Sequence, residues 1–205
     1  MLRLSLLIAT TLIGSTCFAQ GFPGGALPSP QEIDKRVKEE IDKLPDTIAT
    51  LEGVVTFTYK AVPSDPKEIA KQVGNSSGLP PGIDIDQVSK QYAPMIQGML
   101  TKHLATAGTL EAHRAIKVRS KTIPVGKHRF GFTFKGQMIA AIIVRIEGKK
   151  KPIKIDLKSK RSGLQDALKI SCEFDKDKDD QFHVLVGFMR GVSKTRRVLK
   201  APNEG

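Results

Sequence analysis

Few side chains of this sequence could make or break bonds, and its histidines are the first candidates. The chain holds four, at His103, His113, His128 and His183. Glu111 and His113 stand two residues apart in a strand-like segment, so they point to one face of a sheet, and His128 begins the next such segment. A glutamate with two histidines can bind zinc or exchange protons. One hypothesis is therefore a metal-dependent or acid–base hydrolase that uses Glu111, His113 and His128, although no His-Glu-x-x-His spacing is present.

The remaining signals for chemistry are weaker. Cys172 lies in a strand-like segment, where a buried and unreactive thiol is expected. Residues 175–180, Asp-Lys-Asp-Lys-Asp-Asp, imitate the start of a calcium loop. The sixth and twelfth positions of that loop hold Asp180 and Val186 instead of Gly and Glu, so we expect a solvated hairpin turn. The nucleophile-elbow, Walker and dinucleotide-binding motifs are absent. The sequence therefore favours a protein that is not an enzyme and predicts no metal and no cofactor.

Basic charge is the most distinctive property of the sequence. The 205 residues contain 33 Lys and Arg against 21 Asp and Glu, a formal net charge of +12. If a sheet brings its two basic groups together, at 149–161 and 194–200, their field attracts polyanions. The alternative is a solvated surface that protects exposed sheet edges. The residues predicted to bind are Lys149, Lys150, Lys151, Lys154, Lys158, Arg161, Arg196 and Arg197.

The first nineteen residues have the three parts of a secretory signal. A positive end precedes a mostly apolar run, Leu4–Ile13, and small residues fill the two positions that signal peptidase reads before a cut after Ala19. We expect a periplasmic or secreted protein with no transmembrane span in the mature chain, because no later segment has about 18 consecutive apolar residues. Gly14 stands where lipid attachment at Cys17 calls for a bulky aliphatic residue, which disfavours a lipoprotein.

The expected compartment narrows the partners. Outside the cytoplasm, the polyanions that a basic surface meets are anionic polysaccharides, cell-wall polymers and lipid head groups. Aromatic residues make up 5 % of the chain and there is no Trp. Stacking recognition of nucleic acid therefore has no specific signal. The oligomeric state stays open. A third hypothesis is an assembly protein that docks through the helix at 84–107.

The elements that must position these residues are read from the hydrophobic pattern. After a flexible lead-in at 20–29, Ser29 and Glu32 form a capping box for a helix that Pro45 ends. Alternation at 52–60 predicts a first strand, and 65–107 reads as a helical insertion. From Leu110 the period changes to two, and strands are predicted near 111–119, 127–135, 137–146, 153–158, 167–175, 181–190 and 193–199.

Short strands at this spacing predict a mainly β fold, an antiparallel β-sandwich with a helical insertion after the first strand and an N-terminal helix. The sandwich occupies 30–200 as a single domain, and 201–205 is a tail.

One part of the sequence resembles a known family. The segments Gly53–Tyr59 and Ile116–Val118, the hairpin Ile123-Pro124-Val125-Gly126-Lys127-His128, and the late strand before the acidic turn resemble a bacterial exported β-sandwich family of unknown function. The hairpin corresponds to the family's leucine-proline-alanine-glycine-lysine-tyrosine. The resemblance spans 51–60 and 110–190 and implies a β-sandwich and export. The family's tryptophan-arginine-threonine-glycine-alanine-asparagine run is missing, so the resemblance implies no chemistry.

Overall fold

The computed structural model describes residues 29–69, 71, 85–176 and 178–202. The expected signal segment at 1–19, nearly all of the lead-in at 20–29 and the end of the tail at 201–205 lie outside these residues and stay predictions. The helices are α1 (Pro30–Lys43), α3 (Ile85–His103) and the 3-10 turn η1 (Leu104–Thr106), and residues 66–69 are also helical.

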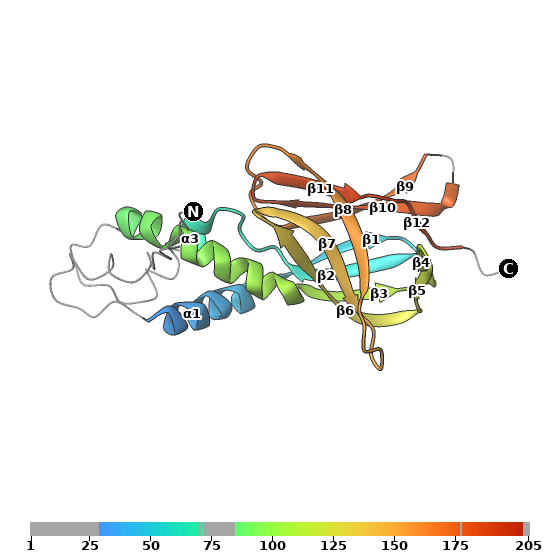
Figure 1. Cartoon of the computed structure of the whole chain (residues 1–205), viewed down its shortest axis with the longest axis horizontal. Coiled ribbons are helices and arrows are strands. Elements are labelled where there is room, and N and C mark those ends of the chain that lie inside the picture. The colour runs from blue at the N-terminus through green and yellow to red at the C-terminus, as the bar shows by residue number, and fades with distance from the viewer. Residues whose placement is uncertain (1–28, 70, 72–84, 177, 203–205) are drawn as a thin grey trace, which may run out of the picture.

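Antiparallel strands make up about half of the described chain (Figure 1). Twelve are found among the described residues: β1 (Asp46–Leu51), β2 (Val55–Lys60), β3 (Gly108–Ala112), β4 (Ile116–Val118), β5 (Lys121–Ile123), β6 (Gly126–Lys135), β7 (Met138–Arg145), β8 (Ile153–Arg161), β9 (Lys169–Asp175), β10 (Lys178–Phe188), β11 (Gly191–Thr195) and β12 (Leu199–Lys200). They join in the order β1-β2-β3-β6-β7-β8-β11-β10-β12-β4-β5, and β9 pairs with the other edge of β10.

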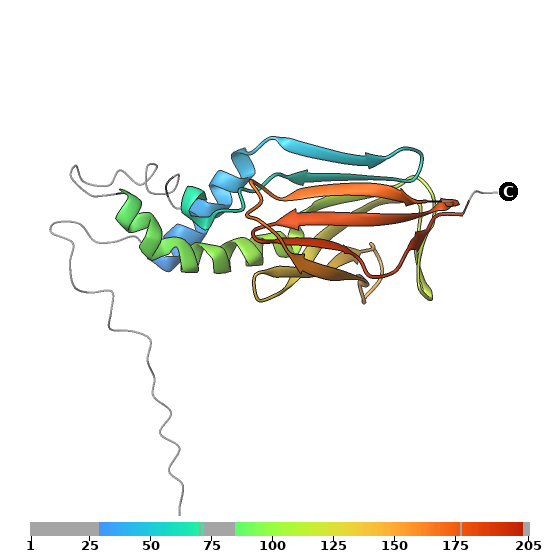
Figure 2. The same ribbon diagram turned by 90° about the horizontal axis from the view of Figure 1, so that it is seen from above.

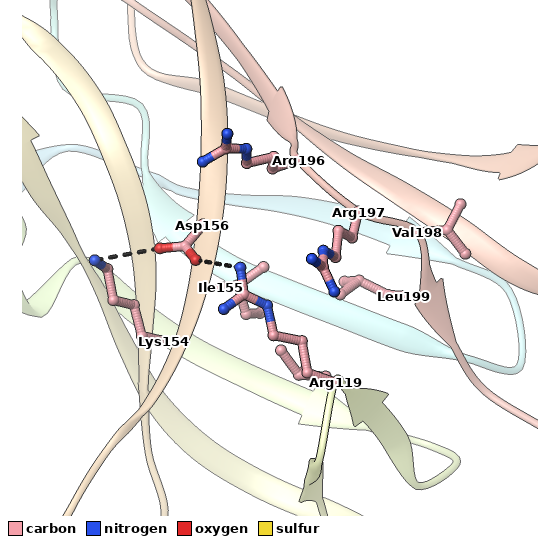
Figure 3. Close-up of a pocket in the computed structure, with 9 residues that line it drawn as sticks. Arg119, Lys154, Ile155, Asp156, Arg196, Arg197, Val198 and Leu199 are labelled. Atoms are coloured by element: carbon pink, nitrogen blue, oxygen red, sulfur yellow. Dashed lines mark hydrogen bonds and ion pairs between the residues drawn. The ribbon is translucent and has the colours of Figure 1, made fainter.

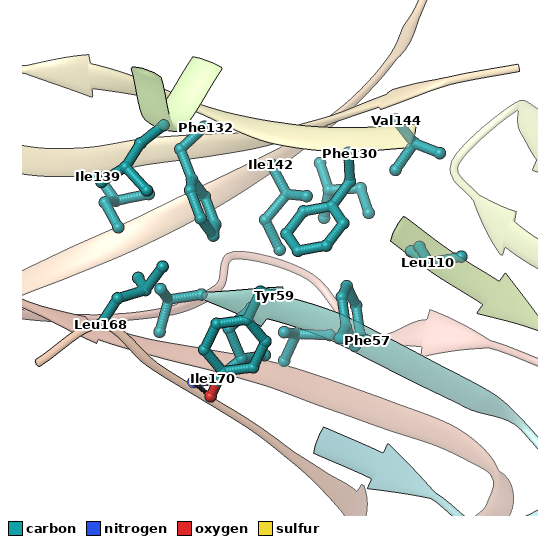
Figure 4. Packing of buried hydrophobic residues seen from close by; sticks show 14 of the residues in the cluster. Phe57, Tyr59, Leu110, Phe130, Phe132, Ile139, Ile142, Val144, Leu168 and Ile170 are labelled. Carbon is teal, nitrogen blue, oxygen red and sulfur yellow. Dashed lines mark hydrogen bonds between the residues drawn. The ribbon is translucent and has the colours of Figure 1, made fainter. Parts of the chain in front are cut away.

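The sheet curls over a single core because β8 changes partners along its length. Ile153–Asp156 pairs with β7, whereas Leu157–Arg161 pairs with β11. On the far side, Pro63 forms a bridge with Ala167 just before β9. The curl brings β6 and β7 across the core from β2 and β9, as in a sandwich (Figure 4).

Aromatic rings fill the centre of this core. Phe57 meets Phe130 edge-to-face with ring centroids 5.2 Å apart, and Phe132 packs on Phe130 in the same way at 5.7 Å. This geometry suits the charge distribution of aromatic rings. Tyr59 is also buried, and its hydroxyl accepts a hydrogen bond from the Ile170 N–H at 3.0 Å. The ring thus contributes to the apolar core, and its polar atom ties β2 to β9 (Figure 4).

The helices form a pair that extends from one end of the sandwich (Figure 2). The side chain of Ser29 accepts from the Glu32 N–H, and the Glu32 carboxylate accepts from the Ser29 N–H, which completes the expected capping box. An ion pair joins the helices, because Lys102 donates to Asp34 at 2.7 Å and His103 lies 2.9 Å from the same carboxylate. The hydrogen bond from Lys102 holds the pKa of Asp34 below its usual value.

The helix pair meets the sheet where η1 lies against β6. A side chain at Gly131 would meet the carbonyl oxygen of Ala105, so only glycine permits this approach. The Ala107 N–H donates to the Phe130 carbonyl at 2.9 Å, and the Arg145 guanidinium donates to Ala105 at 2.9 Å. These contacts fix the root of the helix pair on the sheet.

The mainly β fold with helical additions is confirmed, but the strands differ in detail: the expected strand at 111–119 is divided into β3 and β4. β1 precedes the expected first strand, so the insertion follows the second strand of the sheet. The sequence of β1 does not show the alternation of a half-buried strand, because Leu51 is the only buried residue in β1. Pro94 lies inside α3. Among the described residues, none of the helices combines the length and apolar character that a membrane crossing requires.

The close approach of η1 to Gly131 predicts that alanine destabilises the protein at this position but not at a glycine with open space around it. Gly131→Ala should destabilise the protein by roughly 1–3 kcal/mol, because the backbone of η1 must move away. The matched control is Gly98→Ala in α3, where a methyl group meets open space. This change should stabilise the helix by roughly 0.5–1 kcal/mol. Urea unfolding measures both, and equal midpoints for the two variants would contradict the packing described here.

Candidate functional site

Lys154 and Lys158 of β8 lie on one outward row. Buried Ile153, Ile155 and Leu157 alternate along the strand with the more exposed Lys154, Asp156 and Lys158. In the pairing with β11, Lys158 stands opposite Lys194. Lys194 forms an ion pair with Glu173 of β9, whereas Lys158 has no acidic partner among the described residues. The strand pairing therefore places Lys158 of the first basic group beside Lys194 of the second.

The outward row of β8 borders a small recess at the place where strands diverge (Figure 3). From Leu157 onward β8 pairs with β11, whereas Ile153–Asp156 of β8 pairs with β7. After β11 the chain continues into β12, which pairs with β4 and not with β8. The linking residues Arg196 and Arg197 lie at this fork. The recess has a cavity volume of about 20 Å³, room for about one water-sized group. It could receive one oxygen of an anionic group, but no whole ligand.

Positive charge dominates the recess. Asp156 is its only lining carboxylate, and it accepts from Arg119 at 2.8 Å and lies 3.2 Å from Lys154. Arg196 and Arg197 are both exposed, and neither has an acidic partner among the described residues. Four cations thus surround one carboxylate. The uncompensated charge favours an anion from outside the chain.

Arg119 is a member of this group that the sequence reading missed. It occupies the first position of the two-residue turn between β4 and β5, with a positive φ of 56°. An L-residue pays on the order of 1–2 kcal/mol for this left-handed conformation, which usually favours glycine. The guanidinium approaches the recess from the side opposite Arg197 (Figure 3). A turn without glycine carries no recognisable pattern, so only the fold reveals this residue.

The other predicted binding residues are placed apart from the recess. Lys149, Lys150 and Lys151 lie at the exposed tip between β7 and β8. Arg161 ends β8, roughly 17 Å along the strand from Asp156 at 3.3 Å per residue. It lines a different pocket with residues of two other turns. The predicted strip is therefore divided between a tip, a recess and a second pocket.

The residues of the hydrolase hypothesis do not converge. Glu111 stands opposite Lys127 in the pairing of β3 with β6, and His128 stands opposite Leu110. Neighbouring positions of a strand face opposite sides, so His128 is buried in the core while Glu111 faces outward. His113 contacts the hydroxyl of Thr56 at 3.0 Å. One zinc ion bonds its ligands near 2 Å, which this arrangement does not allow across the sheet.

The acidic turn and the cysteine provide no metal site either. Within the described ranges, no three His, Cys, Asp or Glu side chains are grouped so that they could hold a metal ion. β9 ends at Asp175 and pairs antiparallel with β10, which begins at Lys178, as expected for a hairpin. Cys172 as a whole residue is half-buried. Its thiol group is buried deeply enough that desolvation raises the pKa of the thiol to about 12.

Comparison with known proteins adds no assignment. No family model, curated protein or solved structure matches this chain.

The raised pKa of Cys172 predicts a thiol that stays protonated and reacts slowly. At neutral pH the thiolate is the reactive form, so a disulfide reagent such as dithionitrobenzoate should modify the native protein far more slowly than the urea-unfolded protein. Absorbance of the released thiolate measures both rates. Rapid modification of the folded protein would show that the thiol is accessible and reactive, which would contradict this prediction.

Proposed function

We propose that this protein is an exported, non-enzymatic domain that binds an anionic polymer of the cell envelope. The binding surface is the basic face, defined as Arg119, Lys154, Lys158, Arg196 and Arg197. The observation that carries the proposal is the recess at the strand fork, where four of these cations surround the single carboxylate of Asp156. Export is itself part of the proposal and depends on the signal-like segment at 1–19.

The shape of the basic face favours a polymer over a lipid surface. Lys154 and Lys158 lie roughly 13 Å apart along the outward row of β8, so these two cations can meet different anionic groups of one extended chain. Binding to a bilayer is usually aided by apolar side chains that enter it beside the cations. The large exposed apolar residues of the described chain are Ile48, Val125, Leu164 and Phe174, and none of them belongs to the basic face.

Such binding should be weak per contact and sensitive to salt. The cations of the basic face are exposed, and each exposed ion pair contributes up to about 1 kcal/mol. The Debye length falls from about 10 Å at 0.1 M salt to about 3 Å at 1 M. Affinity therefore depends on several contacts acting together, and it should decline steeply as ionic strength rises.

The test is retention of the protein on immobilised alginate, a polyuronate, at low and high ionic strength. Arg196→Gln with Arg197→Gln should weaken binding about tenfold at low salt, because two exposed ion pairs contribute on the order of 1–2 kcal/mol. The control is Lys67→Gln with Lys90→Gln, which removes the same charge from the helical additions. Charge reversal of Lys149–Lys151 tests the hairpin tip separately.

Two results would contradict the proposal. If the arginine variant and the lysine control lose equal affinity, binding follows net charge and the basic face is not its site. If the protein binds vesicles of phosphatidylglycerol as tightly as alginate, and both arginines matter there too, lipid head groups are the partner instead.

A further inference from the structure

A second basic pocket lies at the end of β8 that is remote from the strand fork. Three segments of the chain meet there. Lys135 ends β6 and Gln137 lies in the turn after it, Arg161 ends β8 and Ser162 follows it, and Arg190 lies in the β10–β11 turn. The cavity volume is about 480 Å³. Pockets for small molecules usually measure about 300–1,000 Å³, so this pocket has the size for a ligand that the recess at the fork lacks.

Hydrogen bonds between the turns hold the pocket in shape. The Ser162 N–H donates to the Arg190 carbonyl at 3.1 Å, and the Gln165 N–H donates to the Met189 carbonyl at 2.7 Å. The Gln165 amide also donates to the Ser162 hydroxyl at 3.1 Å. The chain between β8 and β9 is thus fastened to the β10–β11 turn, and the two arginines are carried on linked backbones.

Met189 is a strained residue in this framework. Its φ is +51° although it is buried and carries a full side chain. Such strain persists only where the surroundings enforce it, and it is often found next to functional groups. Met189 directly precedes Arg190, so the enforced turn determines where the Arg190 side chain begins.

The charge in the pocket is entirely positive. Lys135, Arg161 and Arg190 line it, and no carboxylate does. None of the three has an acidic partner among the residues that the structure describes, and all three are exposed. Three cations near one another repel, so a multiply charged anion between them would remove an unfavourable interaction as well as add favourable ones.

We propose that this pocket binds a phosphate group, either free or as the monoester of a small molecule. Guanidinium groups offer paired N–H donors that match phosphate oxygens, and a lysine adds a point charge. A phosphate monoester carries about −1.5 to −2 at pH 7, which compensates three cations better than a single carboxylate can. The cavity exceeds the needs of a bare oxyanion, and the Met138 side chain offers an apolar contact to an attached organic group.

Calorimetric titration in a chloride buffer can test this with three probes: inorganic phosphate, phenyl phosphate and benzoate. Both phosphates should bind at one site per chain. Phenyl phosphate should bind more tightly than inorganic phosphate if the pocket recognises the attached organic group. The two affinities should be equal if the pocket recognises the phosphate group alone. Benzoate carries the same ring but one negative charge, and it should bind at least tenfold more weakly than phenyl phosphate.

Matched variants locate the site. Arg161→Gln with Arg190→Gln should lower phosphate affinity at least tenfold and leave retention on alginate unchanged. Arg196→Gln with Arg197→Gln removes equal charge from the basic face and should leave phosphate binding unchanged, so the two proposals fail independently. Lys135→Gln, on another hairpin, should give a smaller loss of phosphate affinity. This single variant replaces the double variant in the test if the double variant unfolds at a lower urea concentration. Absence of phosphate binding, equal loss in both arginine pairs, or benzoate binding as tight as phenyl phosphate would overturn the proposal.

Discussion

The architecture depends on one strand that belongs to two walls of the sheet. β8 pairs with β7 up to Asp156 and with β11 from Leu157 onward, and this change of partner lets a continuous sheet enclose its own core. The change leaves the Ile139 carbonyl of β7 beyond the last β7–β8 pair. The Ser159 hydroxyl donates to that carbonyl at 2.6 Å, and the buried Ser193 hydroxyl lies 3.0 Å from it. An unsatisfied buried carbonyl costs about 1–3 kcal/mol. The two serine hydroxyls avoid this cost at the point where β8 leaves β7.

Both basic sites follow from the same strand. Where β8 leaves β7, the strands around it separate, and the recess at Asp156 opens between β8, the β4–β5 turn and the link after β11. Where β8 ends at Arg161, three segments of the chain meet and enclose the larger pocket. The two ends present different kinds of positive surface. The first is open and extended, as polyanion binding requires, and the second is concave, as a small anion requires.

Each of the four histidines contacts a polar atom of a neighbouring residue. Two of them have a structural role: His128 is buried with its Nε2 at 2.8 Å from the Pro124 carbonyl, and the His103 ring contacts Asp34 between the two helices. The thiol of Cys172 is held protonated by burial. Cations, in contrast, face solvent in excess. The cations of both proposed sites remain exposed.

The sequence by itself determined the strand-rich body, the capped first helix and the helical insertion, because hydrophobic period and capping residues act over a few neighbours. It also indicated the two basic groups, since charge is a property of composition. Only the tertiary structure decided which of these charges meet. Strand register placed Glu111 and His128 on opposite faces, and it divided Arg161 from Lys154 although both belong to β8. Arg119, Lys135 and Arg190 entered the sites from segments far apart in the chain. Contacts of this kind depend on how distant strands pair and how the sheet curls, which a local pattern of residues does not determine.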